Sequence, residues 1–219
     1  QDAPVGPFVP VAFQVLAPAQ VDGTQASRSK LPALALQQLS RTVLPSLVAR
    51  AKASGAAAWA KRAALESAVT LLGALPVEVA CSDCSDELRW STLTGLKRLK
   101  EEASGDSPPS ATSETAGLFA AQVMQLLIRS ANHGQAWIED ELHSVVLPIC
   151  EIANSSKIPL VRMGCFRLLL LLMQQSFGHL APFGKQIQAA TKKGVGDRIR
   201  EVRLVAVAAL NGWHCIGAS

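Results

Sequence analysis

Two cysteines, Cys81 and Cys84, are separated by two residues and provide the spacing of a metal-binding pair. A structural zinc site needs four ligands, which usually means a second pair of this kind. The chain contains no second pair, and the nearest histidines, His133 and His143, lie far along the sequence. We therefore expect no metal ion, and we interpret the cysteine pair as part of a solvent-facing loop between helices.

Other residues with chemical potential also favour a structural interpretation. Glu139, Asp140 and Glu141 could supply paired carboxylates for catalysis, but they stand near the start of a predicted helix, where acidic residues are favourable. The four histidines form no recognisable catalytic pattern, and the Gly194-Val-Gly196 turn lacks the strand and lysine of a phosphate loop. We expect no catalytic residues and no cofactor, and hence a non-enzymatic protein.

Cysteine usage and charge suggest a compartment and exclude one class of partner. The five cysteines are an odd number, and Cys150, Cys165 and Cys215 lie in apolar helical patterns. This indicates buried free thiols in a reducing compartment, so we expect the cytoplasm, with the nucleus as a second location. The net charge of +4 is mildly basic and lacks the clustered Lys and Arg that typify nucleic-acid binders, so we expect no nucleic-acid partner.

The composition predicts helices as the elements that position these residues. Apolar residues make up 49% of the chain and aromatic residues only 5%, which favours an Ala- and Leu-rich core of packed helices. Periodicity predicts eight helices and no strand. Paired in order, they predict about four antiparallel hairpins in an all-α protein. The predicted helices cover about 36–54, 58–75, 85–103, 114–130, 136–153, 159–177, 180–193 and 199–213.

The domain organisation follows from proline and glycine. Residues 1–35 are rich in both and predict the end of a preceding repeat plus a loop, whereas 36–215 form the helical domain. Pro45 predicts a kink or a helix start near that position. The Ser- and Pro-rich stretch 104–115 predicts a flexible insertion. Because the chain begins with Gln1, we expect it to be a piece of a longer protein.

Six consecutive apolar residues run from Leu168 to Met173, bracketed by Arg167 and Gln174. A membrane span needs about 20 apolar residues, so we expect no membrane insertion. The wider apolar pattern, residues 158–177, is too long for one strand. The run therefore predicts a helix buried on nearly every side by other helices.

A repeated pattern explains why such a helix would be buried. Two helix starts share a cap residue, then Val-Arg, a small residue and a leucine, at an offset of 41 residues. The small residue and valine would let neighbouring helices approach closely, while the arginine would hold loop carbonyls or an acidic side chain. A weaker copy surrounds Ala60 and Lys61. The two clear copies are Ser156, Val161, Arg162, Cys165 and Leu169, and Asp197, Val202, Arg203, Ala206 and Leu210.

This pattern and its period resemble the HEAT repeat, whose second helix opens with Asp, Val-Arg, Ala and Leu and whose period is roughly 40 to 47 residues. The resemblance implies an α-solenoid of about four HEAT-like antiparallel hairpins. It also implies that Val161, Arg162, Asp197, Val202 and Arg203 are structural positions of the repeat.

A tryptophan beside two cations, Trp59-Ala-Lys61-Arg62, is the strongest candidate for binding a partner. Trp59 stands beside a turn, where an exposed aromatic can anchor another protein. The alternative is that it fills the seam between hairpins. Lys157 and Lys185 would line the same edge as Trp59 if the repeats stack in register.

Two HEAT families share features with these segments. Residues 42–72 and 145–183 are similar to units near the C-terminus of a large HEAT-repeat proteasome adaptor and scaffold, although the insertion at 104–115 departs from that family. Trp59-Ala-Lys61-Arg62 and Lys157-Ile-Pro-Leu-Val161 look like motifs of tubulin-binding TOG domains, although they are closer together here. The first resemblance implies a scaffold that tethers the proteasome to partners, and the second implies tubulin as the partner.

Overall fold

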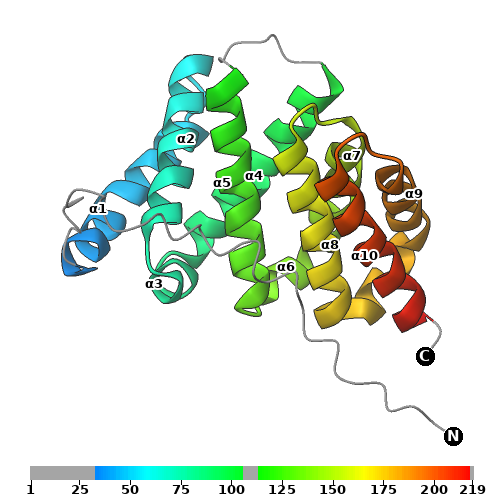
Figure 1. The fold of residues 1–219 in the computed structure, drawn as a ribbon. Helices are drawn as coiled ribbons and strands as arrows, with labels where there is room; N and C mark the ends of the chain where they lie inside the picture. The colour runs from blue at the N-terminus through cyan, green and yellow to red at the C-terminus, as the bar shows by residue number, and fades with distance from the viewer. Residues whose placement is uncertain (1–32, 106–112, 218–219) are drawn as a thin grey trace, which may run out of the picture.

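The computed structural model describes residues 33–105 and 113–217, which fold into helices without any β-strand (Figure 1). The all-α class predicted by composition and periodicity is therefore confirmed over these ranges. Each of the eight predicted helices has a counterpart. The helices are α1 Ala33–Lys52, α2 Ala58–Ala74, α3 Val77–Ser82, α4 Ser85–Ser104, α5 Ser113–Asn132, α6 Ala136–Asp140, α7 Leu142–Ser155, α8 Pro159–Leu180, the 3₁₀ helix η2 Ala181–Phe183, α9 Gly184–Val195 and α10 Arg200–Gly217.

Two helices differ from the sequence-based expectation. The short helix α3 occupies a stretch predicted as a loop, because six residues are too few to show a helical period. The helix predicted over 136–153 is broken at Glu141, whose φ of −108° and ψ of 19° are not helical. As a result α6 and α7 are separate helices that meet at this residue.

Boundaries near proline and in the predicted insertion also differ. Helix α1 begins at Ala33 and continues through Pro45, so no helix starts near that proline. Ser104 is the last residue of α4 and Ser113 the first of α5, so the predicted insertion is helical at both of its ends. Residues 106–112 and 1–32 lie outside the described residues, and with them most of the insertion and of the predicted N-terminal segment.

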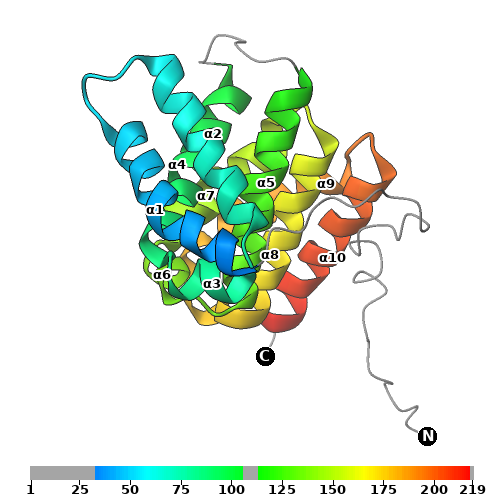
Figure 2. The same cartoon turned by 90° about the vertical axis from the view of Figure 1, so that its left-hand side faces the viewer.

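The long helices pack as antiparallel pairs in two layers. Sequential partners contact each other: α1 with α2, α4 with α5, α7 with α8, and α9 with α10. Within one layer α2, α5, α8 and α10 pack side by side in that order, and within the other α1, α4, α7 and α9 do the same. Figure 1 shows the first layer from cyan to red, and Figure 2 shows α1 and α2 at the end of the array.

Helix α8 contains the apolar run and contacts α5, α7 and α10. Leu168, Leu169, Leu172 and Met173 are at most 1% exposed, because neighbouring helices cover α8 on several sides. The apolar run is therefore helical and largely buried, but Leu170 and Leu171 are only half-buried, so α8 is not covered on nearly every side as predicted. Among the helices described, none is long and apolar enough to cross a membrane.

The small residues of the repeated pattern lie where helices meet. Cys165 on α8 and Ala206 on α10 are fully buried, and the side chains of Val161 and Val202 are at most 2% exposed. Gly194, near the end of α9, approaches α8 so closely that an added Cβ would lie 2.3 Å from the ring of Phe166. These side chains set the short separation between the last two hairpins.

Candidate functional site

The turns before α8 and α10 have the same hydrogen bonds at the offset of 41 residues. Arg162 Nη1 donates to the carbonyl oxygen of Ser156 at 2.9 Å, and Arg203 Nη1 donates to the carbonyl oxygen of Asp197 at 2.8 Å. Each arginine thus holds the carbonyl six residues before it. The expected role of these arginines in binding turn carbonyls is therefore seen in both copies.

Ser156 and Asp197, the predicted caps, are also equivalent, although Ser156 lies two residues before Ile158, the N-cap of α8. The amide of Ile158 donates to Ser156 Oγ at 3.2 Å, and the amide of Ile199 donates to Asp197 Oδ1 at 2.9 Å. In both turns, a side-chain oxygen thus satisfies the amide two residues later. Helix α8 then begins with Pro159, which has no amide hydrogen to satisfy in the first turn.

One ion pair joins these two turns. Arg162 Nε and Nη2 donate to the two carboxylate oxygens of Asp197 at 2.7 and 2.9 Å, and both side chains are largely buried. The hydrogen bonds from Arg162 hold the pKa of the Asp197 carboxyl below its usual range. The ion pair links hairpin α7–α8 to hairpin α9–α10. An acidic side chain was one of the two expected partners of the arginine.

The weaker third copy retains part of this arrangement. Lys61 Nζ donates to the carbonyl oxygen of Ser54 in the turn before α2, at 3.4 Å. Ala60 is buried at the position that corresponds to Val161. A lysine has no planar fork, so it holds the turn by a single bond rather than by several.

Large exposed apolar side chains lie within the first two turns of three neighbouring helices. Trp59 on α2, Leu118 on α5 and Leu160 on α8 are 73%, 62% and 64% exposed. Each precedes a buried residue of its helix, and these helices pack side by side and all begin at the upper end in Figure 1. We call this end of the molecule, with Trp59, Leu118, Leu160 and the turns 53–57 and 156–158, the turn edge.

The predicted partner-binding residues do not all share this edge. Lys157 is exposed in the turn between α7 and α8 and lies at the turn edge with Trp59 and Lys61. Lys185 is exposed at the start of α9, beyond the other end of α8. Because α8 has 22 residues, about 33 Å separates its two ends. The expectation that Lys185 shares the edge with Lys157 is therefore wrong, because α9 starts where α8 finishes.

The remaining tryptophans differ from Trp59 in burial. Trp137 and Trp213 are at most 8% exposed and fill space between helices, with Trp213 against Gly184. Trp90 on α4 is half-buried, with the ammonium of Lys52 5.0 Å from its ring centroid. Trp137 and Trp213 therefore fill space between packed helices, whereas Trp59 is exposed enough to contact another protein.

The cysteine pair does not form a solvent-facing loop. Cys81 lies within α3, and Cys84, only 3% exposed, precedes α4. Burial raises the pKa of both thiols. No group of three or more potential metal ligands occurs in the ranges 33–105 and 113–217. Cys150 and Cys165 are buried as predicted, but Cys215 is exposed because its side of α10 faces outwards.

The acidic cluster that could have been catalytic is tied to a neighbouring helix. Glu141 accepts a hydrogen bond from Arg89 of α4, which lowers the pKa of the Glu141 carboxyl. Glu139 and Asp140 are exposed at the end of α6. The pair between Glu141 and Arg89 connects the junction of α6 and α7 to α4.

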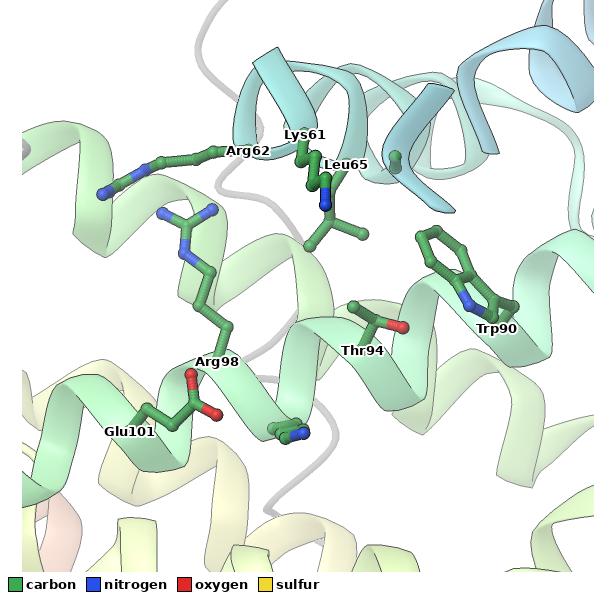
Figure 3. Close-up of a pocket in the computed structure, with 9 residues that line it drawn as sticks. Lys61, Arg62, Leu65, Trp90, Thr94, Arg98 and Glu101 are labelled. Carbon is green, nitrogen blue, oxygen red and sulfur yellow. The ribbon is translucent and has the colours of Figure 1, made fainter. Parts of the chain in front are cut away.

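A basic hollow of about 290 Å³ lies between α2 and α4, close to the turn edge (Figure 3). We call it the α2–α4 hollow. Lys61 and Arg62 could be predicted from the sequence, whereas the lining residues of α4 could not. They belong to a helix some thirty positions away and carry no local signal. The lining residues are Ala51, Lys61, Arg62, Leu65, Trp90, Thr94, Lys97, Arg98 and Glu101.

Four charged residues form a network at one end of the hollow. Arg98 donates to Glu66 of α2 and to Glu102 of α4, both at 2.9 Å. Arg62 contacts the same two carboxylates at 3.1 and 3.7 Å. Figure 3 shows the guanidinium groups of Arg62 and Arg98 facing one another. The network joins α2 to α4 and makes Arg62 primarily a structural residue.

Comparison with known proteins gives no relative: no family model, curated protein or solved structure matches the chain.

Proposed function

We propose that this chain is a non-enzymatic protein-interaction scaffold, built as an α-solenoid of four HEAT-like hairpins. Supporting this architecture, four antiparallel pairs pack in sequential order in both layers. The turns before α8 and α10 also share their hydrogen bonds at an offset of 41 residues. In such an array each hairpin buries its neighbour, and the turns gather along an edge that is free to bind other molecules.

The exposed apolar row at the turn edge carries the proposal. An isolated exposed leucine is ordinary, but Trp59, Leu118 and Leu160 all lie within the first two turns of three adjacent helices. Tryptophan is enriched among residues that dominate protein–protein binding energy. Lys61 and Lys157 add positive charge beside this row, as expected for the polar rim of an interface.

The partner we favour is the proteasome or one of its adaptors, with the chain acting as part of a larger HEAT-repeat adaptor in the cytoplasm or nucleus. The support is the resemblance of residues 42–72 and 145–183 to that family. These residues form α1, α2, α7 and α8, two pairs that each pack as a hairpin.

Tubulin is the second candidate, favoured by the exposure of Trp59. Trp59 lies at the start of α2 and Lys157 in the turn before α8, two helices that begin at the same end of the molecule (Figure 1). An exposed tryptophan flanked by lysines would suit the acidic surface of a partner.

Binding to purified proteasomes and to purified tubulin tests both candidates. We expect proteasome binding, weakened roughly tenfold or more by Trp59→Ala because an anchor at an interface centre is lost. Val43→Ala is the matched control, since it removes an exposed apolar side chain from the middle of α1. Tubulin binding that depends on Trp59 would reject the proteasome assignment. Binding to neither, or equal losses in both variants, would reject the proposed scaffold function at this edge.

A further inference from the structure

The α2–α4 hollow has more positive charge than its own acids neutralise. The carboxylates of Glu66 and Glu102 are engaged by Arg62 and Arg98. Lys61 and Lys97 then remain without an acidic partner in the ranges 33–105 and 113–217, Lys61 donating to the neutral carbonyl of Ser54, and Glu101 is the only acid in the lining. Lys97 is exposed and forms no hydrogen bond or ion pair with any described residue. The hollow thus presents ammonium groups to solvent from both of its walls.

The other part of the lining is apolar. Ala51, Leu65 and Trp90 contribute hydrocarbon and aromatic surface from three different helices. Figure 3 shows Lys61 extending from α2 into the space above Leu65 and Thr94, with Trp90 standing at the far end from Arg98. Lys52 lies over the Trp90 ring and adds a third ammonium beside this wall. Apolar surface flanked by lysines suits a ligand that has both an apolar group and negative charge.

We propose that the α2–α4 hollow binds an acidic peptide segment of a partner protein. Carboxylates of the segment face Lys61 and Lys97, and an apolar side chain packs on Leu65 and Trp90. The volume of about 290 Å³ accommodates side chains rather than a folded element. A nucleic-acid backbone needs Lys and Arg side chains along many successive phosphates, and this short hollow has no continuous stripe of them. This inference rests on the proposed function, because it names the kind of segment that a bound protein would supply.

Fluorescence anisotropy of a labelled ten-residue peptide of alternating Glu and Leu tests the inference. We expect binding that weakens as ionic strength rises, because the lysines are accessible to solvent. The same peptide with Gln in place of Glu should bind at least roughly tenfold more weakly, since it loses the charge interaction.

Lys97→Glu and Lys192→Glu form a matched pair of variants. Both lysines are exposed on helices and the charge change is identical, but Lys192 lies on α9, away from the hollow. We expect Lys97→Glu to weaken peptide binding roughly tenfold and Lys192→Glu to leave it unchanged. Thermal unfolding of both variants verifies that they are folded.

Three outcomes would overturn the inference. These are absence of peptide binding, an equal loss in both variants, and equal binding of the Gln peptide. A single-stranded oligonucleotide that displaces the peptide at matched charge would overturn the assignment to a peptide segment. Because this assay contains only the chain and the peptide, its failure leaves the Trp59-dependent binding at the turn edge to be judged separately.

Discussion

At the scale of single residues, Arg162 joins two turns through its three donors. It binds the carbonyl of Ser156 in its own turn and both carboxylate oxygens of Asp197 in the next. A planar guanidinium supports this arrangement because it carries several donors in fixed directions. The Val-Arg pattern therefore predicts a contact between hairpins, and the partner of that contact, Asp197, belongs to the same pattern one period later.

Replacing Asp197 by Asn should lower the free energy of unfolding by about 2 kcal/mol at pH 7, because a largely buried arginine loses its charged partner. The folded-state pKa of Asp197 is lowered, so its contribution is complete above the ordinary value of about 3.9 and is lost as pH falls through the folded value. The difference between wild type and variant should therefore shrink in acid. Urea unfolding at several pH values measures it.

Asp83→Asn is the control for this substitution. Asp83 pairs with Arg41, whose side chain is 63% exposed, so solvent screening limits the expected loss to at most about 1 kcal/mol. Equal losses in the two variants at pH 7 would contradict the role assigned to Asp197.

The cysteines should differ in reactivity. Burial raises the pKa of Cys150 to about 12 and raises the pKa of the fully buried Cys165 as well. In the native protein a thiol reagent should therefore modify the exposed Cys215 and spare these two until the protein unfolds. Mass spectrometry of labelled peptides locates the modified thiols. Rapid native labelling of Cys165 would contradict the packing of α8.

At the scale of helices, close approach depends on small residues. We expect Gly194→Ala to lower the free energy of unfolding by about 2 kcal/mol, because its Cβ would overlap Phe166 and Ala206. Gly73→Ala in α2 should instead raise it by about 0.5 kcal/mol, since nothing lies within 4 Å and alanine favours the helix. Thermal and urea unfolding compare the two. Equal effects would mean that α8 and α9 are farther apart than described.

Helix positions could be predicted because the long helices carry an apolar period and end near Pro or Gly. The six residues of α3 are too short for this signal. The break at Glu141 carries no Pro or Gly signal, and the contact of Glu141 with Arg89, 52 residues earlier, has no local pattern either. The prediction that Lys185 lies at the same edge as Lys157 was wrong for a related reason. The sequence shows that α9 follows α8, but it does not show at which end of the array the turn between them lies.

At the scale of the whole molecule, stacking creates two surfaces that no single hairpin has. The turn edge unites Trp59, Leu118 and Leu160 from three hairpins, and the α2–α4 hollow requires walls from two. Trp59 could be predicted from the sequence because it is an aromatic residue beside a turn. Leu118 and Leu160 could not, because their exposure depends on how far the neighbouring helices cover them.

The position of the binding surface is the central claim, and site-specific photo-crosslinking in native cell extract tests it most directly. A photoreactive residue is placed at Leu118 or Leu160 on the turn edge, and at Ala181 or Gln186 at the opposite ends of the helices. All four positions are exposed. We predict that positions 118 and 160 crosslink to the same protein, a proteasome component or tubulin, while 181 and 186 do not. Equal crosslinking from both ends, or crosslinking from 181 and 186 alone, would contradict the account.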